Sequence, residues 1–382
     1  MKGFLDEIAE RLRGIEASGL LRSLQAPEGV DFSSNDYLGL SRHPSLRARI
    51  AEAIESWPIS APASRLLRGN LPEHEALEAR LAAFKGTEAA LLFPSGYQAN
   101  LAVLTTLIGP ADLAVSDERN HASIIDGLRL SGSRKAIYPH LELREAERAL
   151  RSRSQGSHGF LVTESLFSMD GDIAPLDRCA DVAERCGATL IIDDAHATGI
   201  YGAKRGSGLS EEHGVEHRAV AIVSTFGKAL GLAGAFVAGP RVVIDYLVNK
   251  ARPFIFSTAV PPLLLAGIHA ALDAVAAEPW RRRRVLELAD RLRAALRNGG
   301  IDNLASAGPI VPVVVGENEH AMRVAEAVRS RGFDVRAIRP PSVAPGTARL
   351  RISVHADHTE AEIDALAQAI AEAATEAPAV AR

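Results

Sequence analysis

The chain has 382 residues, of which 47% are hydrophobic and 24% are charged. This composition is typical of a globular protein long enough for two domains, and it excludes disordered and fibrous classes. The 43 basic and 47 acidic side chains give a formal net charge of −4, so the chain has no overall attraction for nucleic acid or anionic membranes. We therefore expect small metabolites as its partners.

The cysteines and the N-terminal residues indicate the cellular compartment in which we expect the protein. Cys179 and Cys186 lie too far apart along a predicted helix to form a disulfide there. Acidic residues follow the first methionine where a secretion signal would have its apolar core. Both observations favour a reducing cytoplasm. The most lipophilic stretch, 259–277, opens with a prolyl-proline and contains His269 and Asp273, so we expect a buried helix there and no membrane span.

The N-terminal region is predicted to be a helix followed by an arm. An amphipathic helix is expected over 4–24, with Gly19 as its breakpoint. Its apolar positions in helical register are Leu5, Ile8, Leu12 and Ile15. The arm at 31–40 is dense in turn-forming and aromatic residues, and Asn35 within it fits either a structural turn or the lining of a site.

A strand, a turn and a helix follow one another between residues 89 and 107. The apolar run 89–93 predicts the strand, and the turn after it contains Gly96 and Tyr97. The N–H groups at the start of the helix have no intrahelical partner and attract anions. This turn is therefore a candidate phosphate site, although many turns of this kind bind nothing.

Apolar strands then alternate with helices up to about residue 238. The predicted strands are 113–115, 159–163, 189–192, 219–223 and 235–238, and the predicted helices are 71–84, 124–130, 141–151 and 176–186. Strands that are apolar on both faces and separated by helices indicate an α/β fold with a mainly parallel sheet. Ligands bind such sheets beyond the carboxyl ends of the strands.

Polar residues gather after several of these strands, which is the strongest argument for a site. They are Gly96 and Tyr97, Asn120 and His121, Glu164 with the tract 168–172, Asp193 with His196, and Thr225 with Lys228. A lone lysine in this position usually points to water. Lys228 accompanied by Asp193 fits a different use: an amine can hold an aldehyde cofactor, and a carboxylate can keep its pyridine ring protonated.

The last hundred residues predict a smaller α/β domain. Its strands are expected at 310–315 and 349–354, and its helices at about 281–297, 319–331 and 360–374, before an alanine-rich tail. The arginine run that opens the first of these helices alternates with leucines, so we disfavour nucleic-acid binding. Arg349 and Arg351 share one strand face, which suits a carboxylate ligand as well as it suits a solvated surface.

Five tracts together resemble the α-oxoamine synthases, pyridoxal 5'-phosphate (PLP) enzymes of fold type I. They are FSSNDYLGL at 32–40, FSMDGD at 167–172, DDAH at 193–196, TFGK at 225–228 and GTARLR at 346–351. The match runs over nearly the whole chain in the right order. The resemblance implies a homodimer whose chain divides into an arm at 1–40, a large PLP-binding domain at 41–277 with a mainly parallel seven-stranded sheet, and a small C-terminal α/β domain at 278–382.

The resemblance also implies roles around the cofactor ring. Lys228 would hold the cofactor aldehyde covalently and later act as the base at the substrate Cα. Asp193 would keep the ring nitrogen protonated, so that the cofactor serves as an electron sink. His121 would stack on one face of the ring, and His196 and Ser168 would contact its phenolic oxygen side.

Further residues are implied for the cofactor phosphate. Gly96, Tyr97 and Thr225 would donate hydrogen bonds to it, while Ser257 and Thr258 would reach the phosphate in the partner subunit.

The substrates would meet a third group of residues. Arg351 would bind the amino-acid carboxylate, and Arg22 and Asn35 would line the acyl path. Ser342 stands where the best-matching members usually have threonine, and its hydroxyl is retained. The tract 60–65 is stiffer than the glycine-rich segment usual in the family, which leaves the acyl-chain preference open.

The implied reaction is a decarboxylating condensation of L-alanine with a pimeloyl thioester, carried on coenzyme A or on a carrier protein, as in biotin biosynthesis. The stretch RPPSV at 339–343 favours this reaction over those of sister enzymes that use glycine or another thioester. A PLP-binding regulator without catalysis is the alternative outside enzymes, and the joint presence of Lys228, Asp193, His196 and Arg351 argues against it. A nicotinamide dehydrogenase is discounted because no strand leads into the required glycine motif.

Overall fold

The computed structural model describes residues 1–376, and the chain forms two compact units. The larger unit comprises Asn35–Ser168 and Asp172–Arg284, and the smaller comprises Met1–Ser34, Met169–Gly171 and the chain from Val285 onward. The predicted division into segments 1–40, 41–277 and 278–382 stays a prediction. Most of the alanine-rich tail expected after residue 374 lies outside the described residues.

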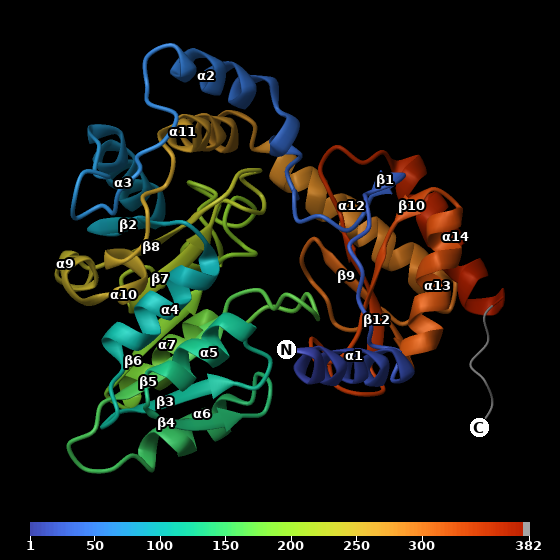
Figure 1. Cartoon of the computed structure of the whole chain (residues 1–382), viewed down its shortest axis with the longest axis horizontal. Helices are drawn as coiled ribbons and strands as arrows, with labels where there is room; N and C mark the ends of the chain where they lie inside the picture. The colour runs from blue at the N-terminus through green and yellow to red at the C-terminus, as the bar shows by residue number, and fades with distance from the viewer. Residues whose placement is uncertain (377–382) are drawn as a thin grey trace. The chain divides into compact units, whose positions relative to one another are not determined.

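The larger unit is built on a seven-stranded sheet (Figure 1). Its strands, in the order β2-β8-β7-β6-β5-β3-β4, are parallel except β8, which runs antiparallel to both neighbours. They are β2 Ala89–Phe93, β3 Leu113–Asp117, β4 Arg134–Tyr138, β5 Gly159–Glu164, β6 Ala188–Asp193, β7 Ala219–Thr225 and β8 Ala235–Gly239. This arrangement confirms the predicted α/β fold class with a mainly parallel sheet.

Helices cover both faces of this sheet. Alternate residues along β6 point to opposite sides: Ile192 joins a core with α6 and α7, while Ile191 joins a core with α4, α5, α9 and α10. The helices of the larger unit are η1 Leu40–Arg42, α2 Pro44–Ile54, α3 Pro72–Lys85, α4 Gly96–Leu107, α5 Ala122–Leu130, α6 Leu143–Arg151, α7 Leu176–Arg185, α8 Leu209–Glu212, α9 Arg241–Lys250, α10 Arg252–Ile255 and α11 Pro262–Ala277. Two-sided cover explains why the central strands read as continuous apolar runs.

The smaller unit contains an antiparallel sheet of order β11-β12-β9 and a parallel strand pair, β1 with β10. The pair joins the N-terminal arm to a strand from the C-terminal region of the chain. Its strands are β1 Val30–Asp31, β9 Ile310–Gly316, β10 Phe333–Asp334, β11 Arg336–Ile338 and β12 Ala348–Ser353. Its helices are α1 Lys2–Ala17, α13 Asn318–Ser330, α14 Glu360–Glu376 and the greater part of α12 Trp280–Asn298.

Three sequence predictions need correction. The helix expected over 4–24 ends at Ala17 and does not resume, although the break expected around Gly19 is confirmed, since Gly19 has a φ of 66° that carries the chain away from the helix. The helix expected from 141 begins at Leu143, because Leu141 has a φ of 59° that no helix accommodates. Strand β4 was missed, since its first residues are exposed and charged, as suits the edge of a sheet.

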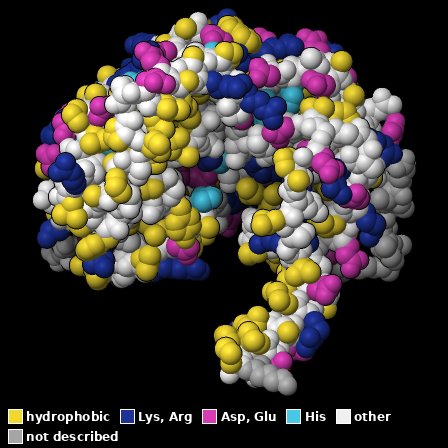
Figure 2. All heavy atoms as spheres, turned by 45° about the horizontal axis from the view of Figure 1, so that its top comes forward, with side chains coloured by type: hydrophobic (Ala, Val, Ile, Leu, Met, Phe, Trp, Pro, Cys, Tyr) yellow, Lys and Arg dark blue, Asp and Glu magenta, His cyan; other side chains and the backbone are white. Residues whose placement is uncertain are grey.

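Two further features bear on membrane and nucleic-acid binding: the apolar character of the helices and the distribution of surface charge. No single helix in the described part of the chain combines the length and apolar character of a membrane span; only α11 and α12 taken together do, and their axes differ by 74°. On the face shown in Figure 2, basic and acidic side chains are interspersed.

Candidate active site

Neighbouring strand ends bring several predicted site residues together in the larger unit. Strands β5, β6 and β7 are parallel and in register, so Glu164 lies opposite Asp193 and Asp193 lies opposite Val223. Lys228 follows β7 in a turn closed by a 2.8 Å bond from the Gly231 N–H to its carbonyl. The predicted convergence of polar groups at these ends is present.

The Asp193 carboxylate is buried and held on both oxygens. Oδ2 accepts a hydrogen bond from Asn100 Nδ2 at 2.6 Å, and Oδ1 accepts one from the Ala195 N–H at 3.0 Å. Asn100 belongs to α4, and its Nδ2 also lies 2.8 Å from Ser123 Oγ. The orientation of Asp193 is thus fixed by groups whose partnership the sequence analysis missed, because Asn100 precedes Asp193 by 93 positions.

His121 caps the N-terminus of α5. Its Nδ1 accepts a hydrogen bond from the Ser123 N–H at 3.2 Å, which places the ring proton of the neutral form on Nε2. Burial lowers the pKa of His121, the Asp193 carboxylate opposes this shift, and the Lys228 ammonium adds to it. The result is a neutral aromatic face, which suits stacking on another ring.

His196 is held by a tyrosine that the sequence analysis did not select. Tyr37 Oη lies 2.8 Å from His196 Nδ1 and donates to Asn35 Oδ1 at 3.1 Å. Asn35, Tyr37 and His196 therefore form one hydrogen-bonded chain. Tyr37 is fully buried although it comes from the N-terminal arm of the larger unit, 159 positions before His196.

The start of α4 adjoins the end of β7. Ser95 caps the helix by accepting from the Gln98 N–H at 3.3 Å, and a side chain added to Gly96 would meet Thr225 at 3.8 Å. Gln98 Nε2 donates in turn to Ser257 Oγ at 3.2 Å. The N–H groups of the first helical turn make this junction suitable for a phosphate, whereas the Thr225 hydroxyl already donates to the Gly234 carbonyl at 2.9 Å.

Glu164 supplies an independent sign of an incomplete polar site. It is buried, and its Oε1 has no hydrogen-bond partner among the described residues. Burial raises the pKa of Glu164 well above its usual range, the Asp193 charge raises it further, and Lys228 lowers it. Buried acceptors are rarely left unpaired in a finished structure.

Comparisons with known proteins decide the family. The model of the aminotransferase class I and II family matches residues 27–370. The chain belongs to this family. The 8-amino-7-oxononanoate synthases of Anaeromyxobacter dehalogenans and Geobacter sulfurreducens are 46% and 42% identical to it over 384 and 379 residues; the matches cover 97% and 95% of this chain, and 96% and 97% of those proteins.

Solved structures agree with this family assignment. Serine palmitoyltransferase from Sphingomonas wittichii has a TM-score of 0.90 at 27% identity, with 98% of each chain covered, and another structure of this enzyme type with the same score contains PLP. 8-Amino-7-oxononanoate synthase from Francisella tularensis has a TM-score of 0.79 at 27% identity, covering 91% of this chain and 98% of its own. The family resemblance, fold type I, the PLP cofactor and the class of PLP-dependent acyltransferase predicted from the sequence are confirmed.

The residues at these strand ends fit PLP. The first turn of α4 offers N–H donors to a phosphate, and Asp193 offers an oriented carboxylate to a protonated ring nitrogen. His121 offers a flat neutral ring, and Lys228 an amine. The N–H donors match the phosphate of PLP, the Asp193 carboxylate matches its pyridine nitrogen, and the Lys228 amine matches its aldehyde.

The structure also shows where Ser168, Thr258 and Tyr97, three further predicted site residues, lie. Ser168 is buried shortly after β5, and Thr258 bridges to Ser64. Tyr97 has an exposed side chain whose hydroxyl donates to Asp126, so only its N–H suits a phosphate. The individual roles assigned to the site residues stay predictions.

Arg22, Ser342 and Arg351 belong to the smaller unit. Arg351 is buried and donates to Ser353 Oγ at 2.9 Å, while Arg22 donates to the Pro340 carbonyl at 3.2 Å. Arg349, next but one to Arg351, pairs with Asp170 at 2.7 Å in the same unit. A solvated face for these strand arginines, the alternative left open above, is therefore wrong.

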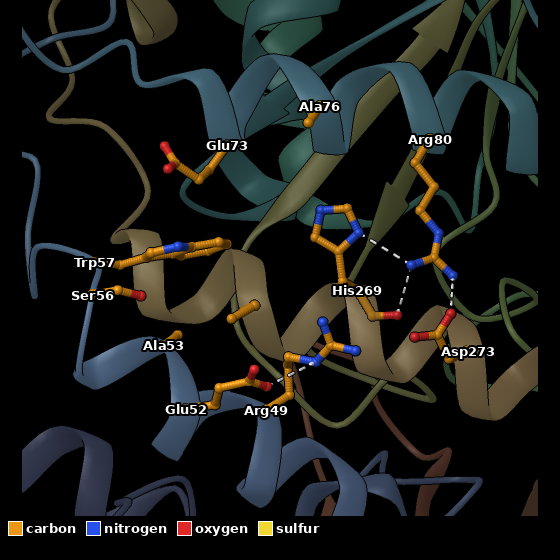
Figure 3. Close-up of a pocket in the computed structure, with 11 residues that line it drawn as sticks. Arg49, Glu52, Ala53, Ser56, Trp57, Glu73, Ala76, Arg80, His269 and Asp273 are labelled. Atoms are coloured by element: carbon orange, nitrogen blue, oxygen red, sulfur yellow. Dashed lines mark hydrogen bonds and ion pairs between the residues drawn. The ribbon is translucent and has the colours of Figure 1, made fainter.

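A cavity of about 430 Å³ lies elsewhere in the larger unit, between α2, α3 and α11 (Figure 3). Trp57, Arg80 and His269 are among its lining residues, and none of the predicted site residues lines it. Arg80 crosses from α3 to bond with the His269 carbonyl at 3.0 Å.

His140, which comes just after β4, provides a test of pH dependence. Its Nδ1 and Nε2 lie 2.8 Å from Asp117 and 2.7 Å from Asp172, respectively. Burial alone would lower the pKa of His140, but these two carboxylates outweigh it and raise the pKa to about 9. The charged form is thus favoured in the folded protein, and its stabilisation, about 2 kcal/mol after allowance for solvent screening, is complete below pH ~6.5 and lost as the pH rises through ~9.

The measurement is the free energy of unfolding in urea for wild type and His140→Gln at about pH 6 and about pH 10. We expect the advantage of the wild type to shrink by about 2 kcal/mol between these values. An advantage that stays constant over this range would contradict the double pairing.

Proposed function

We propose that the protein condenses L-alanine with a pimeloyl thioester, forming 8-amino-7-oxononanoate and releasing carbon dioxide and the free thiol. The observation that carries the proposal is 42–46% identity, over nearly the whole chain, to curated proteins with this synthase name. The serine palmitoyltransferase neighbours favour, as a second candidate, a sister reaction with another amino acid or acyl chain, but their identity to the chain is only 27%.

The amino acid is activated at the strand ends of the larger unit. Bound PLP supplies an electron sink for the electron pair left at the alanine Cα. Lys228 removes the Cα proton, and Asp193 holds the ring nitrogen in its protonated state through the orientation that Asn100 imposes. His121 would stack on one face of the ring, and His196 and Ser168 would contact its phenolic oxygen side.

The acyl transfer follows, and each bond that forms is matched by one that breaks. The alanine Cα forms a carbon–carbon bond to the thioester carbonyl, and the carbon–sulfur bond breaks to release the thiol. The alanine carboxylate leaves as carbon dioxide, and its electron pair returns to Cα, which is reprotonated. Arg351 binds that carboxylate before it leaves, Arg22 and Asn35 line the acyl path, and Ser342 contributes to substrate binding.

We propose that the enzyme acts as a homodimer in the cytoplasm. Support for a partner comes from α1, where Phe4, Leu5 and Leu12 are 63%, 59% and 50% exposed. In the dimer, Ser257 and Thr258 contact the phosphate bound by the partner subunit. Cys179 and Cys186 are both unpaired, which suits a reducing compartment.

Product analysis tests the reaction. The purified protein is incubated with L-alanine, glycine or L-serine against coenzyme A thioesters of different lengths and against pimeloyl carrier protein. We expect 8-amino-7-oxononanoate and one carbon dioxide per thiol with alanine and the pimeloyl group. A Lys228→Ala preparation serves as the control for contaminating activity. Turnover confined to glycine or serine, or to long acyl chains, would contradict the proposal and assign a sister reaction.

A further inference from the structure

A fully buried ion pair lies next to the cofactor site. Lys85 ends α3 and Asp194 follows β6, and both side chains are 0% exposed. Lys85 Nζ donates to Asp194 Oδ2 at 2.7 Å, to Thr198 Oγ1 at 3.2 Å and to the Ser207 carbonyl. All three ammonium protons are therefore used, and one lysine ties three points of the chain to the end of α3.

The Asp194 carboxylate also accepts hydrogen bonds on both of its oxygens. Ser165 Oγ donates to its Oδ1 at 2.6 Å, and Ser210 Oγ donates to its Oδ2 at 2.7 Å. Backbone N–H groups of Leu209 and Ser210 add bonds of 3.2 and 3.3 Å. A side chain added to Gly208 would come within 2.1 Å of Oδ2, so the backbone packs directly on the carboxylate. The carboxylate has no room to move.

Stability alone does not explain this pair. Burial lowers the pKa of Lys85, and the Asp194 charge opposes that shift, as expected when a charge is taken out of water. Well-packed apolar residues in place of a buried ion pair are often neutral or stabilising. Unlike apolar packing, the ion pair orients the groups that it joins, because hydrogen bonds fix the positions of their acceptors.

The fixed positions bracket one cofactor residue, His196, and adjoin a second, Asp193. Lys85 bonds the side chains of Asp194 and Thr198, and His196 lies midway between them. Asp193 immediately precedes this turn. Thr198 Oγ1 also donates to the Asp194 carbonyl at 2.8 Å and lies 3.0 Å from Ser224 Oγ, which connects the turn to β7.

We propose that Lys85 is a positioning residue for the PLP site. By holding both ends of the turn 194–198, it sets where the Asp193 carboxylate meets the ring nitrogen and where the His196 ring lies. Lys85 does not touch the reacting atoms and acts through this turn. The proposal requires PLP binding alone and does not depend on which amino acid or thioester the enzyme uses.

The test compares three variants with a matched control. Lys85→Met removes the ammonium, and Lys85→Met/Asp194→Asn removes it without leaving an unpaired buried charge. Thr198→Val keeps the ion pair with almost no change in shape, but removes the hydroxyl that accepts from Lys85 and also bonds the Asp194 carbonyl and Ser224. Arg80→Met is the control, since Arg80 lies on the same helix but bonds Asp273 and His269 of α11 (Figure 3) and no residue of the turn.

Three quantities are measured for each variant: the melting temperature of the PLP-free protein, the PLP dissociation constant, and the pH midpoint of the visible absorption of the PLP-bound protein. We expect the dissociation constant to rise about tenfold or more in both Lys85 variants, the scale on which supporting partners act at metal sites. In Thr198→Val we expect a rise of about threefold, the scale of one ordinary hydrogen bond. The pH midpoint shifts with it, because Asp193 and His196 no longer hold their positions. In Arg80→Met the melting temperature falls and the other two quantities do not change.

One pattern of results would overturn the proposal. If the melting temperature falls while the dissociation constant and the pH midpoint stay within twofold and ~0.2 units of wild type, Lys85 acts on stability alone. Should the Lys85 variants fail to fold, Thr198→Val decides by the same two readouts, because its substitution is nearly isosteric. Failure of the proposed acyl transfer would leave these PLP measurements unaffected.

Discussion

Lys228→Ala is expected to lower kcat by about 10⁴-fold or more while the protein still binds PLP. The loss is large because the same amine holds the cofactor aldehyde and moves the Cα proton, and general acid–base groups alone contribute about 10²–10⁴-fold. The phosphate donors at α4, the oriented Asp193 and the His121 ring do not depend on Lys228, so they retain the cofactor. The measurement pairs steady-state turnover with PLP titration of the PLP-free protein.

Borohydride distinguishes this role from a merely structural one. Reduction of the wild-type protein should attach PLP irreversibly to the peptide that contains Lys228, as found by mass spectrometry, and the variant should yield no labelled peptide. Lys250→Ala, an exposed lysine at the end of α9, is the matched control and should label like wild type. Turnover by Lys228→Ala above ~1% of wild type, or labelling at another lysine, would contradict the role.

The strand-end residues were predictable because each follows its strand within a few positions. An apolar run followed by Asp193, or by Thr225 and Lys228, reveals a strand end and a polar group together. Parallel pairing then brings the ends to one edge of the sheet without further information. The prediction that polar groups gather at these strand ends therefore needed only local patterns and the rule for such sheets, whereas the roles of single residues toward PLP came from the family resemblance.

The partners of these residues were not predictable in the same way. Asn100 reaches Asp193 from 93 positions away, and Lys85 reaches Asp194 from 109 positions away. Neither residue stands out in its own segment: Asn100 lies within a helix pattern, and Lys85 looks like an ordinary basic residue in a last helical turn, where cations are favoured. Only the packing of α3 and α4 around the sheet gives them their partners.

The edge strand β4 and the antiparallel direction of β8 were not predicted, for a related reason. Strand β4 is paired on one side only and starts with Arg134 and Lys135, so it lacks the apolar run by which the buried strands were found. Strand β8 has that run, but its direction depends on pairing with β2 and β7 and leaves no mark in its own residues. Direction and edge position are properties of the assembled sheet.

Asp193→Asn should lower kcat by about 10²–10³-fold, the scale of losing one preorganised charge at a reacting group. The amide is neutral and no longer holds a proton on the ring nitrogen, so the electron sink weakens. It also meets a mismatch, because the aspartate accepts from both Asn100 Nδ2 and the Ala195 N–H, whereas an amide offers one acceptor and one donor. The direct measurement is exchange of the alanine Cα proton in heavy water without thioester, which isolates the first step.

The mismatch and the lost charge can be separated by exchanging the two side chains. Asp193→Asn/Asn100→Asp restores an amide–carboxylate hydrogen bond across the same 2.6 Å contact, but moves the negative charge from the end of β6 onto α4. If orientation of the pair were all that mattered, the double variant would regain exchange. We expect it to regain melting temperature while exchange stays about as slow as in the single variant, because the charge no longer meets the ring nitrogen. Exchange within about tenfold of wild type in either variant would show that Asp193 does not control the protonation of the ring.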